Sequence, residues 1–472
     1  MARSRVSRQQ QKTLSLFDEA DFAEDRVKPE SERGGLRGTP AQPKEPIRET
    51  QVSDLLEQVV APQNMRMALK RVEQNKGAAG GDGMTVDSLR PFLLSHWSCL
   101  RSALLAGTYR PQPVKRVEIP KPSGGVRLLG IPTVLDRLIQ QALLQVLTPL
   151  FDPYFSPASY GFRPGKRGHD AVREAKKYIR SGYDWVVDLD LEKFFDRVNH
   201  DILMARLARS ISDKRVLRLI RRFLTSGVLI NGLVSATEEG TPQGGPLSPL
   251  LSNIVLDDLD KELTRRGHRF VRYADDCNIY VGSRRAGERV KASVTAFLED
   301  RLRLKVNEAK SAVARPWVRK FLGLTFTHVD KRTRLAPASL QKVKDKIRSL
   351  TQRSAAISIA ERIRQLNQYL GGWMGYFALS ESPSTFSELD EWMRRRLRMC
   401  QWKQWKRTRT RVRELRALEL KELHVWEAAG SRKAYWRLAK SPPLHKALNN
   451  AYWRELGFVT LTDRYQRVRN AW

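Results

Sequence analysis

The segment Tyr273-Ala274-Asp275-Asp276 lies between two apolar stretches, residues 270–271 and 277–281, whose residue types favour β-strands. The pattern predicts a strand, a tight turn and a second strand, with both aspartates at the tip of the hairpin. Another apolar stretch, residues 185–190, lies upstream and ends in Asp188-Leu189-Asp190. A chain with these segments is therefore expected to bring carboxylates from separate strands to one end of one sheet.

Carboxylates in such an arrangement are suited to divalent cations. Three of them on adjacent strands can bridge two metal ions about 4 Å apart, a geometry that serves in-line nucleotidyl transfer. Mg²⁺ takes one or two carboxylates together with substrate phosphates. Asp188 and Asp190 lie on the same face of their strand, so spacing alone does not decide which of them joins Asp275 and Asp276. The tetrapeptide by itself is a weak signal, because most Asp-Asp pairs are solvated turn residues.

The net charge of the chain indicates a polyanionic partner. The 472 residues include 85 Lys and Arg against 51 Asp and Glu, a net charge of +34, while 41% of the residues are hydrophobic. This combination predicts a folded protein that binds nucleic acid. Residues 331–472 hold 31 basic and 12 acidic residues, so more than half of the excess lies in the last third. We expect that part to contact the phosphate backbone.

Cysteine usage and hydropathy restrict the compartment. Cys99, Cys277 and Cys400 are the three cysteines, and no two are close in sequence. This spacing excludes a zinc ribbon and a disulfide framework, and it indicates a reducing environment. The chain has no run of 18 apolar residues, and its start lacks the apolar segment of a signal peptide. We therefore expect a soluble, cytoplasmic protein with no membrane partner.

Composition and periodicity predict three parts. Residues 1–50 are polar and are expected to form a flexible extension, with a short anchoring turn near Phe17 as the alternative. Residues 51–330 mix helices and strands without βαβ regularity, which predicts an α+β architecture with a sheet covered on one face. Residues 331–472 are expected to be helical. Within these parts, the sequence predicts a helix broken at Pro62, strand pairs at 114–129, 227–236 and 311–328, and an extended basic segment at 407–413.

Taken together, the ordered motifs resemble the reverse transcriptase/maturase of bacterial group II introns. The matching stretches are residues 75–83, Ile119–Pro122 with Arg127–Pro132, Ser159–Pro164, Asp190–Asp196 with Asn199 and His200, 240–253, Tyr273–Asp276, Asn307 with Lys310, Phe321–Gly323 and 362–377. The resemblance runs from about residue 52 to the end, and it is to the short members of the family that lack an endonuclease domain. It implies a right-hand polymerase with fingers and an antiparallel palm at 51–330, followed by a helical thumb/maturase domain at 331–472.

The resemblance also implies a role for each matching residue. The catalytic residues would be Asp190, Asp275, Asp276 and Lys310; two Mg²⁺ ions would be held by the three aspartates and the Leu191 carbonyl. The nucleotide-binding residues would be Lys121, Arg127, Leu191, Phe195 and Gln243, and the primer end would rest on Phe321, Leu322 and Gly323.

Some of these roles have plain alternatives. The family pattern favours Asp190 over Asp188, because Phe195 then lies five residues on, where its ring can exclude a ribose 2′-hydroxyl; ordinary core packing is the alternative. Lys121 and Arg127 are expected to face each other across a hairpin and to bind phosphates, or else to be two solvated cations. Gln243 is flanked by Pro242 and two glycines, which let the backbone approach closely.

In the last third, cations are interleaved with indoles, a pattern typical of nucleic-acid surfaces. The predicted RNA-binding residues are Arg394, Arg395, Arg396, Arg398, Lys403, Lys406 and Arg407. Trp402 and Trp405 are expected in the core instead.

The leading hypothesis is an RNA-directed DNA polymerase encoded by a group II intron, which also binds intron RNA to assist splicing and retrohoming. Its partners would be intron RNA, an RNA template, a DNA primer or target and dNTPs, with a homodimer as one form of assembly. One alternative is a related reverse transcriptase recruited to DNA repair or phage defence. Another is a splicing-only maturase, against which the intact acidic residues argue.

Overall fold

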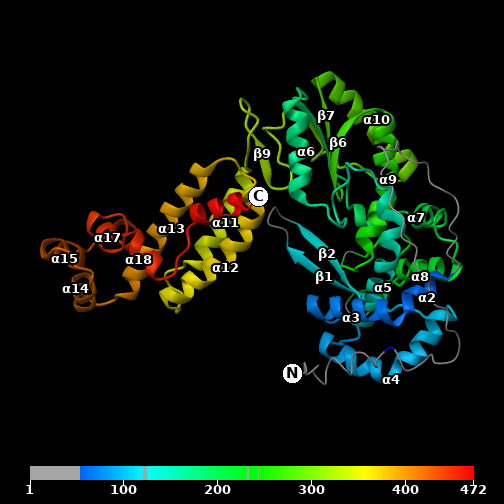
Figure 1. Ribbon diagram of the computed structural model, residues 1–472, viewed down its shortest axis with the longest axis horizontal. Helices are drawn as coiled ribbons and strands as arrows, with labels where there is room; N and C mark the ends of the chain where they lie inside the picture. Colours follow the sequence, from blue (N-terminus) through cyan, green and yellow to red (C-terminus); the bar gives the residue numbers. More distant parts are fainter. Residues whose placement is uncertain (1–16, 18–53, 121–124, 231–232, 243, 472) are drawn as a thin grey trace, which may run out of the picture. The chain divides into compact units, whose positions relative to one another are not determined.

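The computed structural model describes residue 17 and residues 54–120, 125–230, 233–242 and 244–471 (Figure 1). The chain divides into two compact units that do not follow its linear order. The first comprises Met1–Arg167 with Val187–Val313, and the second Gly168–Val186 with Ala314–Trp472.

The first unit begins with helices α2 (Leu55–Val60), α3 (Pro62–Asn75), α4 (Val86–Leu105) and α5 (Val134–Phe151). The predicted break at Pro62 is confirmed, because proline lacks an N–H and its fixed φ suits the first position of a helix. Phe17 is buried with its ring edge on Trp97 of α4, the centroids 5.0 Å apart. At this residue the anchoring alternative is correct; the rest of residues 1–53 lies outside the described residues.

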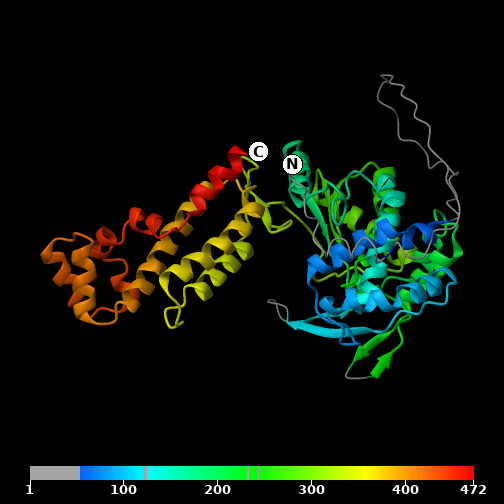
Figure 2. The ribbon, with the colours of Figure 1, turned by 60° about the horizontal axis from the view of Figure 1, so that its bottom comes forward.

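One sheet of the first unit has the order β2-β1-β4-β5. Its strands are β1 (Val114–Pro120), β2 (Val126–Ile131), β4 (Val228–Ile230) and β5 (Leu233–Ser235). Both predicted hairpins are confirmed: β1 pairs antiparallel with β2, and β4 with β5. The hairpins join through a parallel β1–β4 pair, and Figure 2 shows them in cyan and green.

The second sheet, which we call the palm sheet, has the order β6-β7-β3-β8. Its strands are β3 (Trp185–Leu189), β6 (Arg269–Tyr273), β7 (Asp276–Val281) and β8 (Ala312–Ala314). Helix α9 (Ser248–Arg265) lies against β6, and α10 (Arg284–Leu302) lies against β7. Helices α7 (His200–Leu207) and α8 (Lys214–Leu224) complete this part. The mixed architecture with antiparallel hairpins confirms the predicted fold class.

The predicted strand pair at 311–328 is wrong. Strand β8 joins the palm sheet, whereas β9 (Leu324–Phe326) pairs antiparallel with β10 (Thr333–Leu335). Each of these strands has three residues, too few for an alternating pattern to identify a partner.

The second unit includes helix α6 (Gly168–Arg180), and from Pro337 onward its described part is helical. The helices after Pro337 are α11 (Pro337–Leu350), α12 (Ile359–Phe377), α13 (Pro383–Gln404), α14 (Thr408–Ala417), α15 (Glu422–Ala429), α16 (Tyr435–Leu438), α17 (Pro442–Ala447), α18 (Asn450–Glu455) and α19 (Leu461–Asn470). The predicted extended segment at 407–413 is wrong, because Val412 and Leu415, three positions apart, bury one face of a helix. None of the helices that the structure describes combines the length and apolar character needed to cross a membrane.

Candidate active site

The three predicted aspartates lie at adjacent strands of the palm sheet. β7 begins at Asp276, Asp275 lies in the turn before it, and Asp190 directly follows β3, the neighbour of β7. Burial raises the pKa of the Asp275 carboxyl, and the negative charge of Asp190 raises it further. The charges of these two residues are therefore coupled, as the sequence predicts for one shared site.

Asp188 and Asp190 act on different groups near the hairpin. The charge of Asp190 acts on the Asp275 carboxyl, whereas Asp188 acts on Cys277. The Cys277 thiol is buried, and burial is the main reason that its pKa lies well above the usual range. Asp188 and Asp276 both act on Cys277, so the choice of Asp190 over Asp188 as the third metal ligand stays a prediction.

Lys310 lies beside Asp190, with its Nζ 3.6 Å from Oδ1. The backbone explains this position. The Asn307 N–H donates to the Asp190 carbonyl at 2.8 Å, and the Asp190 N–H donates to Ser311 Oγ at 3.0 Å. Leu191 forms an isolated antiparallel bridge to Val306. The segment that carries Lys310 is therefore held along the end of β3.

Arg127 also acts on this site, because its positive charge lowers the pKa of Asp275 against the effect of burial. It is exposed on β2. The predicted pairing with Lys121 is corrected: the β1–β2 register places Ile119 opposite Arg127. The sequence did not fix the length of the turn and hence the register. Lys121 itself lies outside the described residues.

Phe195 is half-buried in a short 3₁₀ helix, with its ring 5.2 Å from that of the buried Phe194. The Phe195 carbonyl accepts a hydrogen bond from the Thr241 N–H at 2.6 Å. His200 Nε2 donates to the Gly240 carbonyl at 2.7 Å. These two bonds join the Phe195 segment to the loop that leads to residue 243.

Gln243 lies outside the described residues, but its neighbour Gly244 shows how closely the loop packs. Gly244 has φ +128°, and a Cβ there would lie 2.6 Å from the Gly130 carbonyl oxygen of β2. The absence of a side chain at Gly244 therefore lets this loop pack closely against strand β2.

Arg272, which no sequence motif singled out, is fully buried behind the hairpin turn. Its Nη1 donates to the Ala274 carbonyl at 2.8 Å and to Asn253 Oδ1 at 3.0 Å, and its Nη2 donates to Ser159 Oγ at 2.8 Å. Asp260 of α9 neutralises its charge. The available signal was a cation inside an apolar strand, Phe270-Val271-Arg272-Tyr273. Arg272 thus ties the turn to two distant segments.

Gly161 packs directly on the same turn. A Cβ at Gly161 would lie 2.2 Å from the Ala274 nitrogen, so no larger residue fits without movement of backbone. Asn253 Nδ2 donates to the Gly161 carbonyl at 2.9 Å. Ala274 has φ +57°, an uncommon conformation for a residue with a Cβ. The turn is therefore enclosed on the side of Gly161.

The predicted primer-binding residues form a tight turn in the second unit. Phe321 and Leu324 exchange two backbone hydrogen bonds, and Leu322 between them has φ +50°. Tyr376 Oη donates to the Leu322 carbonyl at 2.9 Å, and Ser339 Oγ donates to the Gly323 carbonyl at 2.8 Å. Helices α11 and α12 thus hold the turn by hydrogen bonds to its backbone.

The predicted RNA-binding residues do not form one surface. Lys403, Lys406 and Arg407 are exposed. Arg398 is buried and donates to the Ala439 carbonyl at 2.9 Å, so its assignment to RNA is wrong. Burial, followed by the charges of Arg394 and Arg395, lowers the pKa of Arg398 to about 10.

Two further arginines of this set serve packing within the second unit. Arg395 stacks on Trp436 with 3.8 Å from Cζ to the ring centroid, and Arg396 donates to Thr351 Oγ1 at 2.5 Å. The predicted core positions of Trp402 and Trp405 are confirmed, since both are buried. A sequence pattern of cations does not distinguish arginines that face solvent from those that fill gaps between helices.

The donor set at the hairpin suits Mg²⁺. Among the described residues, no three His, Cys, Asp or Glu side chains form a ready-made metal cluster. Mg²⁺ does not require one, because it commonly uses one or two carboxylates with substrate phosphates and water. The charge of Asp190 and burial raise the pKa of Asp275, and a cation bound between the two carboxylates would stabilise their ionised forms. These residues therefore fit a Mg²⁺ site.

Two segments of the chain match known families. Residues 119–326 match the reverse transcriptase (RNA-dependent DNA polymerase) family, and residues 340–418 match the maturase-specific domain of group II introns. Among solved structures, the partial Cas6-RT-Cas1–Cas2 complex is 29% identical, covering 52% of this chain and 42% of that chain, with a TM-score of 0.35.

Curated relatives extend the likeness. Protein YkfC of Escherichia coli (strain K12) is 33% identical over an alignment of 302 residues, and the match covers 56% of this chain and 79% of YkfC. The group II intron-encoded protein LtrA of Lactococcus lactis subsp. cremoris is 37% identical over 215 residues, which are 45% of this chain and 36% of LtrA. With both characteristic segments present in order, the chain belongs to the group II intron reverse transcriptase/maturase family.

Proposed function

We propose that the protein is an RNA-directed DNA polymerase whose catalytic centre lies at the hairpin end of the palm sheet. One observation carries the proposal: the charges of Asp190 and Arg127 both act on Asp275, and Lys310 Nζ lies 3.6 Å from Asp190 Oδ1. These four residues come from four separate segments, and their chemistry is that of nucleotidyl transfer. Membership of the family supports the same activity.

Each residue has a proposed part. Asp190, Asp275, Asp276 and the Leu191 carbonyl would hold two Mg²⁺ ions, which when bound supply charge neutralisation for the triphosphate and activation of the primer hydroxyl. Lys310 would donate a proton to the leaving pyrophosphate.

Other residues would position the substrates. Arg127, with Lys121, would bind the phosphates of the incoming nucleotide. Phe195 would exclude a ribose 2′-hydroxyl, and Gln243 would position the nascent base pair. The turn Phe321–Gly323 would seat the primer end.

The second part of the proposal is that the chain binds the RNA of its own intron and assists splicing and retrohoming. The match of residues 340–418 to the maturase-specific domain and the excess of basic residues after residue 330 support it. In this proposal residues 51–330 form the fingers and palm, residues 331–472 the thumb/maturase domain, and residues 1–50 an extension.

Primer extension tests the polymerase. Purified protein is assayed on poly(rA)/oligo(dT) with and without Mg²⁺, next to Asp275→Asn and the exposed control Asp87→Asn. Asp275→Asn should lower the extension rate by about 100-fold or more while RNA affinity by filter binding is retained. Wild-type rates in Asp275→Asn would refute the site. A wild-type protein that binds RNA but never extends a primer would favour the splicing-only alternative.

A further inference from the structure

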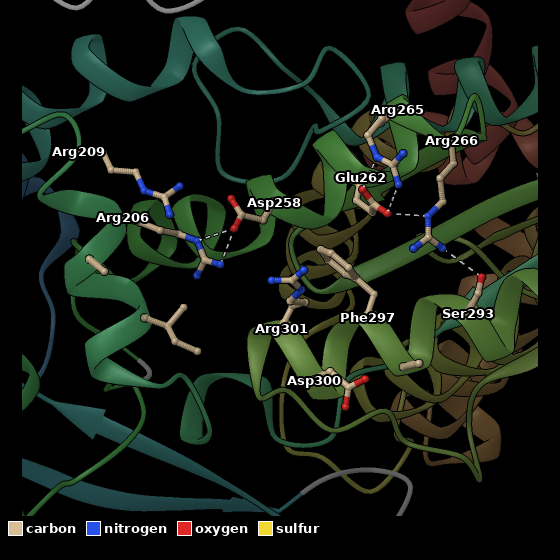
Figure 3. Close-up of a pocket in the computed structure, with 13 residues that line it drawn as sticks. Arg206, Arg209, Asp258, Glu262, Arg265, Arg266, Ser293, Phe297, Asp300 and Arg301 are labelled. Atoms are coloured by element: carbon tan, nitrogen blue, oxygen red, sulfur yellow. Dashed lines mark hydrogen bonds and ion pairs between the residues drawn. The ribbon is translucent and has the colours of Figure 1, made fainter.

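A cleft of about 840 Å³ lies on the helical side of the palm sheet, within the first unit. Its walls come from α7 with Arg209, from the C-terminal half of α9 with Arg266, and from the C-terminal half of α10 (Figure 3). None of the predicted catalytic, nucleotide-binding or primer-binding residues lines it. Its volume falls within the range of about 300–1,000 Å³ typical of ligand sites.

The lining of the cleft carries a net positive charge, all of it from arginine. Five arginines and three acids give it a net charge of +2; the arginines are Arg206, Arg209, Arg265, Arg266 and Arg301, and the acids are Asp258, Glu262 and Asp300. No lysine lines it. Guanidinium groups are planar, multiply donating cations whose geometry matches phosphate oxygens.

Two of the acids are already neutralised within the protein. Arg206 donates twice to Asp258, with 2.9 Å from Nε and 2.5 Å from Nη2 to Oδ2. Glu262 accepts from both Arg265 and Arg266 at 2.7 Å, and the Arg265 hydrogen bond is the main cause that lowers the pKa of Glu262 to about 2. Both carboxylates are paired with guanidinium groups, so they repel an incoming anion only weakly.

The remaining cations are available to a ligand. Within the described part of the chain, neither Arg209 nor Arg301 has an ion-pair or side-chain hydrogen-bond partner, and both are exposed. Figure 3 shows Arg206 and Arg209 on one wall and Arg301 on the other, with its guanidinium reaching into the space between them. Arg206 is buried and paired with Asp258, so it lends positive charge to the wall without offering an exposed donor. Two exposed guanidinium groups, those of Arg209 and Arg301, therefore face the cleft without ion-pair partners among the described residues.

An aromatic ring completes the lining. Phe297 is half-buried in the wall formed by α10, and the guanidinium of Arg266 lies over its ring, 6.0 Å from the centroid. A basic groove that also offers an aromatic face is typical of sites for single-stranded nucleic acid, where phosphates contact cations and a base packs on a ring. An acidic peptide would use the cations but has no need of the ring.

We propose that this cleft binds the backbone of a single-stranded nucleic acid, with phosphates between Arg209 and Arg301 and a base against Phe297. RNA and DNA share this chemistry, so the experiment uses both. The inference concerns a site apart from the polymerase centre, and it is tested by binding without dNTPs or Mg²⁺. Failure of primer extension would therefore leave it unaffected.

The test compares two double variants with equal loss of charge. Arg209→Gln/Arg301→Gln removes the two unpaired cations of the cleft. Arg218→Gln/Arg289→Gln removes two exposed cations of the same unit that lie outside the cleft. Affinity for a U-rich RNA 20-mer and for the corresponding DNA is measured by fluorescence anisotropy from about 50 to 200 mM salt.

The cleft variant should bind about tenfold more weakly, and the slope of log affinity against log salt should fall by about 1.4, which corresponds to two phosphate contacts on a single strand. The control should keep the wild-type slope. A tenfold loss for only one of the two oligonucleotides would support the proposal and identify RNA or DNA as the ligand of the cleft. The proposal would be overturned if both double variants lost affinity equally, or if the slope of the cleft variant were unchanged. It would also be overturned if the cleft variant lost affinity for polyglutamate while its affinity for the oligonucleotides was intact.

Discussion

Arg272 and Asp260 form an ion pair in which both side chains are completely buried, with 2.6 Å between Nη2 and Oδ2. The pair joins β6, the strand before the hairpin turn, to helix α9. Burying two charges is costly, so the remaining donors must also be satisfied. In this protein Ser159, Asn253 and the Ala274 carbonyl accept them, and the turn is fixed as a consequence.

Arg272→Met should lower the free energy of unfolding by about 3–5 kcal/mol, because it leaves the Asp260 carboxylate buried without a partner. The double variant Arg272→Met/Asp260→Leu should recover part of this loss, because no unpaired charge remains. The exposed pair Arg364–Glu361 is the control, and Arg364→Met should leave the free energy of unfolding nearly unchanged, because exposed ion pairs contribute little. Urea denaturation measures all of them. Equal losses for Arg272→Met and Arg364→Met would contradict the assigned role.

Gly161→Ala should disturb the turn from its other side. The added methyl group would lie 2.2 Å from the Ala274 nitrogen, so the backbone that carries Asp275 must move. A misplacement of about 1 Å can lower a catalytic rate by about 100-fold. Gly282→Ala is the control, since nothing lies within 4 Å of a Cβ there. Steady-state primer extension should show the loss for Gly161→Ala only, and a rate equal to that of the control would exclude close packing on the turn.

His200 should make stability depend on pH. Burial lowers the pKa of His200 below its usual 6.5, and the Gly240 carbonyl opposes this effect only in part. The unfolded chain therefore binds a proton more readily, so stability is full above about pH 6.5 and falls as the pH drops through the folded-state pKa. The loss amounts to about 1.4 kcal/mol for each unit of pKa difference.

Unfolding measured between pH 7.5 and 5 tests this prediction. His200→Gln should remove this part of the pH dependence, whereas His96→Gln, at an exposed position on α4, should keep the wild-type profile. Parallel profiles for wild type and His200→Gln would show that the protonation of His200 is not linked to folding.

Two classes of basic residue in the second unit should behave differently. Replacing the exposed Lys403, Lys406 and Arg407 by Gln should lower the salt slope of RNA binding by up to about 2, through the loss of three phosphate contacts. Arg398→Met should instead lower stability by about 1–3 kcal/mol, because buried acceptors lose their donor. Salt titrations and urea denaturation separate the two effects. A change of slope in a fully folded Arg398→Met protein would restore that arginine to the RNA surface.

Local features of this chain followed from sequence. The hairpin at Tyr273–Asp276, the helix start at Pro62 and the strands around residues 114–131 all depend on residues close together in the chain, such as turn formers and alternating apolar residues. The family was also evident, because its motifs occur in order along the chain. These features need no knowledge of distant contacts.

Other features were decided by tertiary structure. The action of the Asp190 charge on Asp275 depends on how two strands pair, whereas strand alternation alone puts Asp188 and Asp190 on one face. The burial of Arg272 depends on Ser159, which is 113 residues away in sequence. The cation pattern predicts Arg398 at the surface, but its hydrogen-bond partners lie more than 40 residues further along. A long side chain can extend to solvent or fill a gap between elements, and only the positions of those distant partners decide which.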